Sequence, residues 1–286
     1  MTLVQWTYDD GYNAYRASGE TVPSLPPGYY WLATDHNSRL LFYPSSARKD
    51  TLLQFPDSVT KDVISGISDF WDREETFRKY GLPYKRGILL HGPAGTGKTS
   101  ALQIIAREVI AAGGIVLTYH PDLFNSGYSA LREIQPDTPL VVFIEDIELY
   151  EAPEFKKTAE FLNMLDGAQK IDRTVFLATT NHPEKLSARI INRPSRFDMI
   201  IEVPHPDTEM RRMYLASLAG DDIDTERYVR DTEGMSFAHL KELFVATVIL
   251  GRGYDETLAR LKAMHLTPFK PSDQPSSNGV AAGQYL

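Results

Sequence analysis

Short apolar runs and segments of helical periodicity alternate through the middle of the chain. Five apolar runs predict β-strands, at 87–91, 115–119, 140–144, 174–178 and 199–203. The run 140–144 contains no polar residue, which is typical of a parallel strand buried on both faces. Between the runs, apolar residues recur every three or four positions and predict helices, at 57–80, 100–112, within 120–135 and at 154–165. This alternation predicts an α/β domain built on a parallel sheet.

The pattern changes at both ends of this domain. Beyond residue 207 only helical periodicity is left, with candidate helices at 207–219, 224–231 and 236–250. The last residues are rich in Pro, Ser and Gly and poor in apolar side chains, so we expect disorder there. We therefore divide the chain into an N-terminal appendage, an α/β domain, a helical region and a disordered tail, with bounds at 1–55, 56–205, 206–266 and 267–286.

The N-terminal appendage is rich in aromatic residues, Pro and Gly. We expect a mostly β or irregular structure, in which Tyr29–Ala33 and Arg39–Tyr43 pair as a short hairpin across Thr34–Ser38. Its aromatic side chains could form a binding surface. The core of an extension too small to bury much is the more ordinary interpretation.

A glycine-rich loop, G-x-x-x-x-G-K-T, lies between the first apolar run and the helix that follows it. Strand, loop and helix in that order are the context that a phosphate loop requires, which disfavours an ordinary glycine-rich turn. Glycines let backbone N–H groups surround a polyphosphate, Lys98 would reach the β- and γ-phosphates, and Thr99 would hold magnesium. The predicted cofactors are ATP and Mg²⁺, and the predicted nucleotide-binding residues are Gly92, Pro93, Ala94, Gly95, Thr96, Gly97, Lys98, Thr99 and Ser100.

Polar residues follow two of the predicted strands. Glu145 and Asp146 come directly after the buried run 140–144, where a phosphate-loop enzyme needs one carboxylate for magnesium and a second to polarise the attacking water. An ordinary acidic turn is the alternative. Asn181 follows the next strand and could hydrogen-bond the γ-phosphate or orient the water, although Asn at a strand end is more often a turn residue.

Two arginines, Arg193 and Arg196, lie three residues apart before the last predicted strand. Arginine suits bidentate contacts to phosphate, so a neighbouring subunit could supply both as arginine fingers that stabilise transition-state charge. A surface salt bridge, with Asp198 or Glu202, is the alternative. The predicted catalytic set is thus Lys98, Glu145, Asp146, Asn181, Arg193 and Arg196, with Thr99 and Glu145 as the metal ligands.

Composition narrows the function classes. The 286 residues carry a formal net charge of −8, which argues weakly against nonspecific binding of nucleic acid. No cysteine is present, so disulfides, thiolate catalysis and zinc–thiolate sites are excluded. No apolar run approaches the roughly 18 residues of a spanning helix, and the N-terminus does not look like a signal peptide. We expect a cytoplasmic protein without a membrane span.

Five segments in order, from about 57 to 250, resemble the AAA family of ring ATPases. The phosphate loop matches the family's GPPGTGKT except at Ala94, and the other four segments are Phe161–Gly167, Thr179–Leu186, Arg193–Asp198 and Thr232–Leu240. The resemblance implies a P-loop NTPase sheet with helices on both faces, followed by a small helical lid. It also implies a hexameric or heptameric ring of identical subunits whose sites are completed by the arginines of a neighbour.

Within the family, the chain is most similar to Bcs-type proteins. The signs are Tyr80–Gly87, the order of Glu145 and Asp146, and Asn181–Leu186. That order implies that Glu145 takes the magnesium side and Asp146 the water-activating position. Bcs-type proteins include a mitochondrial inner-membrane translocase, whose membrane helix and import segment have no counterpart in this sequence, so membrane translocation does not carry over. Ser195 stands where the family has Gly between the two arginines.

The resemblance leaves three functions open. An ATP-hydrolysing ring that remodels or moves a protein partner is the first. A nucleic-acid motor needs Lys and Arg in the pore, and the segment 122–128 that would line the pore has none. A scaffold ring that uses ATP as a slow assembly switch is the third. In this pore segment Phe124 and Tyr128 are candidates to touch a threaded substrate, and core or subunit contacts are their alternative roles.

Overall fold

The computed structural model of the chain describes residues 5–9, 14–18, 21–45, 59–152, 155–167, 171–220 and 223–266. The chain separates into two compact units, Met1–Pro206 and Asp207–Leu286. The predicted disordered tail, 267–286, lies outside the described residues. Within the described ranges, none of the helices combines the length and apolar content that crossing a bilayer requires.

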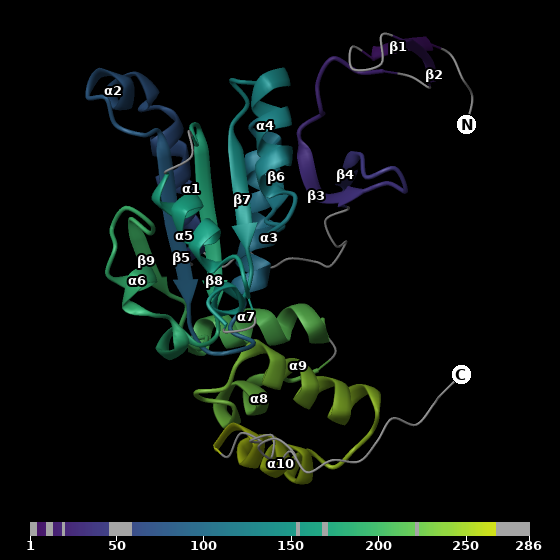
Figure 1. The fold of residues 1–286 in the computed structure, drawn as a ribbon. Helices are drawn as coiled ribbons and strands as arrows, with labels where there is room; N and C mark the ends of the chain where they lie inside the picture. Colours follow the sequence, from purple (N-terminus) through teal and green to yellow (C-terminus); the bar gives the residue numbers. More distant parts are fainter. Residues whose placement is uncertain are drawn as a thin grey trace, which may run out of the picture. The chain divides into compact units, whose positions relative to one another are not determined.

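The first unit is organised around a seven-stranded sheet in the order β4–β3–β6–β7–β8–β5–β9 (Figure 1). All neighbouring strands are parallel except β3 and β4. The strands are β3 (Gly28–Thr34), β4 (Leu40–Pro44), β5 (Lys85–His91), β6 (Ile115–Thr118), β7 (Leu140–Ile144), β8 (Thr174–Thr180) and β9 (Met199–Glu202). The five strands predicted from the apolar runs are confirmed, and so is the mostly parallel α/β fold.

Helices cover both faces of this sheet. Residues of α1 and α3, such as Val63 and Ile105, pack on one face, and residues of α4 and α5, such as Leu131 and Phe161, pack on the other. Because β7 lies between the two layers, all five of its residues are buried, as its apolar run predicts. The helices of this unit are α1 (Val59–Trp71), α2 (Glu74–Lys79), α3 (Lys98–Ala111), α4 (Phe124–Ile134), α5 (Thr158–Asp166) and α6 (Ala188–Ile191). Short 3₁₀ turns are η1 (Ile147–Tyr150) and η2 (Pro183–Lys185).

One predicted helix is divided. The described part of the periodic segment 57–80, from residue 59 on, forms α1 and α2 as separate helices, because the chain turns tightly at Asp72 and Arg73. There the Arg73 N–H donates to the Phe70 carbonyl, a three-residue closure that ends the α-helical pattern. The rings of Phe70 and Phe77 still pack against Tyr84 on both sides of the break. The apolar periodicity therefore continues across a turn that has no strong sequence signal.

The N-terminal hairpin forms as predicted, but it is part of the main sheet. Strands β3 and β4 pair with Thr34 opposite Leu40. In the turn, the Asp35 carboxylate accepts from two backbone N–H groups, those of Asn37 and Arg39. Strand β3 then pairs in parallel with β6, from Gly28–Ile115 onward, and extends the sheet by two strands. The other described strands of the predicted appendage, β1 (Gln5–Asp9) and β2 (Ala14–Ser18), form a separate antiparallel pair.

The second unit is helical. It contains α7 (Thr208–Ala219), α8 (Glu226–Asp231), α9 (Phe237–Phe244), the π-helical turn η3 (Val245–Ile249) and α10 (Tyr254–Leu266). Its core gathers Leu215, Val229, Leu240, Leu243 and Leu261. The Asp207 carboxylate caps α7 by accepting from the Met210 N–H at 2.8 Å.

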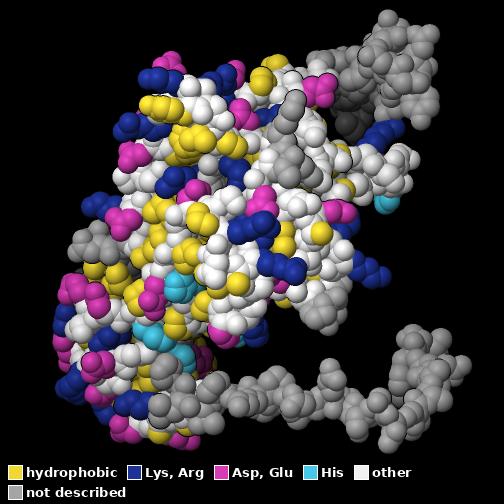
Figure 2. Space-filling view, turned by 60° about the vertical axis from the view of Figure 1, so that its left-hand side comes forward, with side chains coloured by type: hydrophobic (Ala, Val, Ile, Leu, Met, Phe, Trp, Pro, Cys, Tyr) yellow, Lys and Arg dark blue, Asp and Glu magenta, His cyan; other side chains and the backbone are white. Residues whose placement is uncertain are grey.

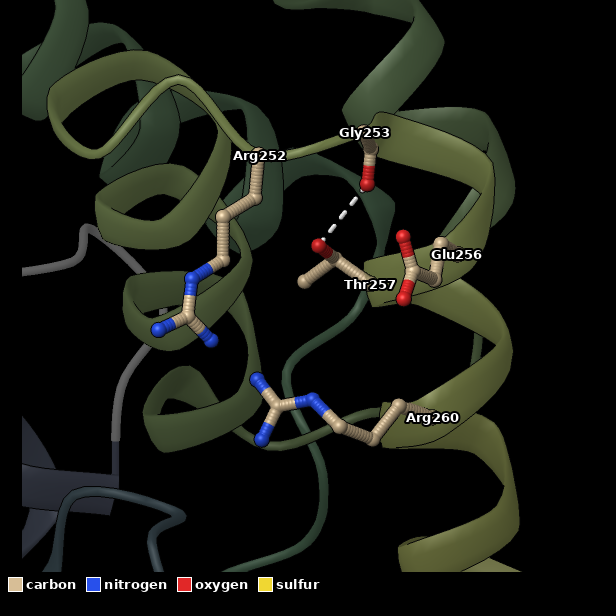
Figure 3. A pocket seen from close by; sticks show the side chains of 5 residues that line it. All are labelled: Arg252, Gly253, Glu256, Thr257 and Arg260. Atoms are coloured by element: carbon tan, nitrogen blue, oxygen red, sulfur yellow. Dashed lines mark hydrogen bonds between the residues drawn. The ribbon is translucent and has the colours of Figure 1, made fainter.

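A surface pocket of about 360 Å³ lies at the start of α10 in the second unit. Its lining residues are Arg252, Gly253, Glu256, Thr257 and Arg260. Figure 3 shows the guanidinium groups of Arg252 and Arg260 directed toward one another. The Thr257 hydroxyl is used locally, since it donates to the Gly253 carbonyl. All of these residues belong to the second unit, whereas the sequence places the phosphate loop in the first.

Candidate nucleotide site

The predicted phosphate loop connects β5 to the 14-residue helix α3. Gly97 caps α3 with a left-handed backbone (φ 99°), and Lys98 begins the helix. A side chain at Gly97 would strain this conformation, which explains the glycine. The first-turn N–H groups of α3 and the positive end of its dipole therefore point to the loop, as an anion site requires.

Backbone packing holds the start of the loop against Val203, the residue that follows β9. A Cβ atom on Gly92 would lie 2.2 Å from the Val203 carbonyl oxygen, so only glycine fits there. The buried Lys98 ammonium donates to the carbonyls of Gly92 and Pro93 at 2.7 and 2.8 Å, which keeps it inside the curve of the loop. Burial lowers the pKa of Lys98, while the nearby carboxylates of Asp146 and Glu148 act in the opposite direction. The lysine thus lies among the groups that would meet a polyphosphate.

The two predicted metal ligands are neighbours. The Thr99 hydroxyl donates to the Glu145 carboxylate at 3.3 Å, across the gap between α3 and the end of β7. Both side chains are exposed, and both offer the oxygen ligands that Mg²⁺ prefers. Among the described residues, no group of three or more His, Cys, Asp and Glu side chains could hold a metal by itself. One hydroxyl and one carboxylate fit an ion that is bound jointly with nucleotide phosphates.

Asp146, the second predicted carboxylate, and Asn181, the predicted amide, are also in contact. Asp146 follows β7 in a left-handed conformation (φ 49°, ψ 56°), which is uncommon for a residue with a side chain. Its Oδ1 accepts from the Asn181 amide at 3.1 Å. This contact arises because Ile144 pairs with Ala178 in the parallel sheet, so β7 and β8 end at the same edge. Backbone strain on the order of 1–3 kcal/mol is kept only where the surrounding contacts fix it.

The two predicted finger arginines have different environments. Arg196 is 4% exposed and grips Asp166 with two parallel hydrogen bonds, from Nε at 2.9 Å and Nη2 at 2.6 Å. Its remaining Nη1 donates to the Arg189 carbonyl. The Arg193 side chain is 58% exposed and makes a single 2.9 Å contact with Asp166. The alternative salt bridge therefore exists, but with Asp166 instead of the expected Asp198 or Glu202.

A family model described as "ATPase family associated with various cellular activities (AAA)" matches residues 88–205. We call residues 88–205 the AAA domain after this match. The match begins within β5 and ends just after β9, so it covers the phosphate loop, both carboxylates, Asn181 and both arginines.

Curated archaeal relatives extend this similarity at low identity. Protein SAV of Sulfolobus acidocaldarius is 29% identical, over 85% of this chain and 36% of that protein. Proteasome-activating nucleotidases of Saccharolobus solfataricus and Methanothermobacter thermautotrophicus are 32% and 30% identical, over 60% of this chain and 49% and 47% of those proteins. The chain thus spans between about a third and a half of the length of these relatives. They do not show the Bcs-type subfamily, which stays a prediction.

Asp166 contacts both predicted finger arginines, and the sequence did not single it out as a candidate. It accepts hydrogen bonds from Arg193, Arg196 and the Ser195 hydroxyl, and the Arg196 guanidinium holds the pKa of Asp166 below its usual value. A sequence signal was available. Asp166 is the last residue of α5, where a carboxylate is unfavourable toward the helix dipole unless it has cationic partners.

The segment that carries the arginines is also tied to β5, the strand that leads into the phosphate loop. The Lys85 ammonium donates to the carbonyls of Ser195 and Leu165. The Gly87 N–H donates to the Asp198 carboxylate at 2.7 Å, and the Asp198 N–H returns a bond to the Gly87 carbonyl at 2.8 Å. These contacts fix the backbone around the arginines and leave the Arg193 side chain exposed.

Phe124 and Tyr128, the candidates to touch a threaded substrate, are core residues of the AAA domain. Phe124 is 1% exposed and Tyr128 is 8% exposed, on the sheet-facing side of α4. The Tyr128 hydroxyl donates to the Asp172 carbonyl and accepts from the Asp172 N–H. Of the roles that the sequence left open, a contact with threaded substrate does not fit these burials, and a core role does.

Proposed function

We propose that this chain binds and hydrolyses MgATP in a ring of six or seven identical subunits and uses the cycle to remodel or move a protein partner. One observation carries the proposal. Lys98 and Thr99 at the start of α3, Glu145 and Asp146 after β7, and Asn181 after β8 come from three separate places in the sequence and converge at the carboxyl edge of the sheet. Such convergence is typical of ligand sites in open parallel sheets.

Each side chain then has a role that its contacts support. The loop N–H groups and Lys98 hold the phosphates, and Thr99 with Glu145 would hold Mg²⁺. The metal, when bound, supplies charge neutralisation at the phosphoryl group. Asp146, oriented by Asn181, accepts the proton of the attacking water. The exposed edge leaves room for a water between this carboxylate and the nucleotide.

The charge that completes the site comes from Arg193 of the neighbouring subunit. Arg196 has all of its described hydrogen bonds directed inward, to Asp166 and Arg189. Arg193 can leave Asp166 at a small cost because its side chain is 58% exposed and Asp166 keeps the bidentate bond to Arg196. Of the two predicted fingers, Arg193 therefore reaches the phosphate and Arg196 holds the segment in place.

A protein partner is favoured over nucleic acid. Two of the relatives are called proteasome-activating nucleotidases, a name that points to protein substrates for those proteins. On the face drawn in Figure 2, the described Lys and Arg side chains are interspersed with Asp and Glu and do not gather into a basic surface. Near the loop that follows β6, the Lys157 ammonium is paired with Asp122 at 2.7 Å.

The test compares three variants of the full chain. Lys98→Ala should abolish binding of a fluorescent ATP analogue. Arg193→Ala should keep binding but lose hydrolysis by about 10³-fold or more, the range known for arginine fingers. Arg189→Ala removes another exposed arginine nearby and should behave like the parent. Turnover per subunit should rise with protein concentration, and concentration-independent turnover by a monomer would exclude the ring.

A further inference from the structure

Tyr29 brings a phenol to the nucleotide site from outside the segment that matches the AAA family model. It lies on β3, where it pairs with Val116 of β6 in the parallel sheet. Its ring packs edge-on against Phe143 of β7, with the centroids 5.6 Å apart. The Thr118 hydroxyl, at the carboxyl end of β6, donates to the Tyr29 hydroxyl at 3.0 Å. The phenol oxygen thus lies at the edge of the sheet where the nucleotide site is built.

Tyr29 also lies on the same face of the sheet as Glu145, the face that α3 covers. Phe143 lies in β7 and Glu145 directly follows the strand, two residues further on, so their side chains leave the chain on the same side. Phe143 packs in the α3-side core, and Glu145 contacts Thr99 of α3, which agrees with this alternation. Tyr29 packs against the same core. Burial raises the pKa of the Tyr29 phenol, the hydrogen bond from Thr118 lowers it, and the negative charge of Glu145 raises it.

The Tyr29 hydroxyl can donate its own hydrogen to a second partner besides Thr118. Because the Thr118 hydroxyl donates, the Tyr29 oxygen is an acceptor in that bond and its own hydrogen is available. We propose that Tyr29 is a positioning residue that donates this hydrogen toward the Glu145 carboxylate through one water, and so sets the affinity of the site for Mg²⁺. This inference rests on the proposed function and adds a positioning residue supplied by an N-terminal strand.

Tyr30, the next residue of β3, provides a matched control. It is 5% exposed and lies on the opposite face of the strand, where it packs against Phe42. Its hydroxyl donates to the Pro26 carbonyl at 2.8 Å, away from the carboxylates of the site. Tyr29→Phe and Tyr30→Phe therefore delete the same atom from adjacent residues and keep both rings. A purely structural role of the hydroxyl would give similar results for the two variants.

The experiment measures binding of a fluorescent ATP analogue to the full chain while Mg²⁺ is varied, with EDTA as the metal-free limit. Tyr29→Phe should need about tenfold more Mg²⁺ for half-maximal metal-dependent binding, as for other residues that orient a metal ligand. Binding in EDTA should match the parent. Thermal unfolding, followed by circular dichroism, should stay within about 2 °C of the parent value, as for the loss of one half-buried hydroxyl.

The outcomes separate this inference from the proposed function. If Tyr29→Phe has the Mg²⁺ requirement of the parent, or if Tyr30→Phe shifts it by the same factor, Tyr29 has no positioning role. If the parent chain shows no Mg²⁺-dependent binding and behaves like Lys98→Ala, the proposed function itself is wrong. A shift confined to Tyr29→Phe, with unchanged binding in EDTA, supports the assignment.

Discussion

Replacing Arg196 and Arg193 one at a time should separate a structural arginine from a catalytic one. Arg196→Ala removes two bonds to Asp166 and one to the Arg189 carbonyl from a side chain that is 5% exposed. Breaking a buried ion pair costs about 3–5 kcal/mol. Asp166 is 21% exposed and keeps Ser195 and Arg193 as donors, so we expect the lower end, about 3 kcal/mol.

Arg193→Ala removes one contact from a side chain that is 58% exposed, which should cost about 0.5 kcal/mol. In a unit of this size, 1 kcal/mol shifts the melting temperature by about 2–4 °C. Arg196→Ala should therefore melt roughly 6–12 °C below the parent, and Arg193→Ala roughly 1–2 °C below it.

Urea unfolding of the full chain, followed by circular dichroism, gives both free energies on one scale. Arg196→Lys is the matched control: it keeps the charge but cannot form the parallel pair of bonds to Asp166, so it should lose most of the same stability. Equal destabilisation by Arg193→Ala and Arg196→Ala would refute the assignment of separate roles. So would an Arg196→Ala protein that is as stable as the parent.

Four further substitutions test the rest of the site. Asp146→Asn should keep nucleotide binding and lower turnover by about 10²-fold or more, whereas Glu145→Gln should raise the Mg²⁺ requirement about tenfold; parent-like turnover in Asp146→Asn would overturn its assignment as base. Gly92→Ala places a Cβ 2.2 Å from the Val203 carbonyl oxygen and should weaken binding of a fluorescent ATP analogue at least about tenfold, so an unchanged affinity would show that the loop tolerates a side chain. The pKa of Asp166 is lowered in the folded chain, so its ion pairs stabilise the fold above the usual value of 3.8 and are lost as pH falls through the folded pKa. Asp166→Asn should accordingly reduce the unfolding free energy at pH 7 and flatten its fall below pH 4, and a parent-like acid profile would contradict this.

The sequence predicts much of the nucleotide site because a parallel sheet converts order along the chain into position. Glu145 and Asn181 follow two strands whose carboxyl ends must meet once β7 and β8 are neighbours. Thr99 and Glu145, which the sequence predicts as ligands of one metal, are in contact, whereas the hydrogen bond between Asn181 and Asp146 is visible only in the structure. The phosphate-loop motif, the direction of the strands and their order in the sheet are together enough to bring these residues to one edge.

Contacts between distant segments are less predictable. Nothing in the apolar pattern of residues 28–34 shows that β3 pairs in parallel with β6, more than 80 residues away, and so brings Tyr29 to the site. The different roles of Arg193 and Arg196 depend on Asp166, which is distant in sequence and whose position is fixed by the end of α5. The burial of Arg196 therefore depends on the tertiary fold, and the short segment that contains both arginines does not predict it.

Mixing two inactive variants tests the central claim, that one subunit holds the nucleotide and its neighbour supplies the finishing charge. Lys98→Ala removes the nucleotide site but keeps Arg193, and Arg193→Ala keeps the site but lacks the finger. Each protein alone should be inactive, and an equimolar mixture that is allowed to reassemble should recover about a quarter of the parent ATPase activity, the statistical share of productive neighbours. A mixture as inactive as its parts, under conditions where both variants are shown to co-assemble, would contradict the account.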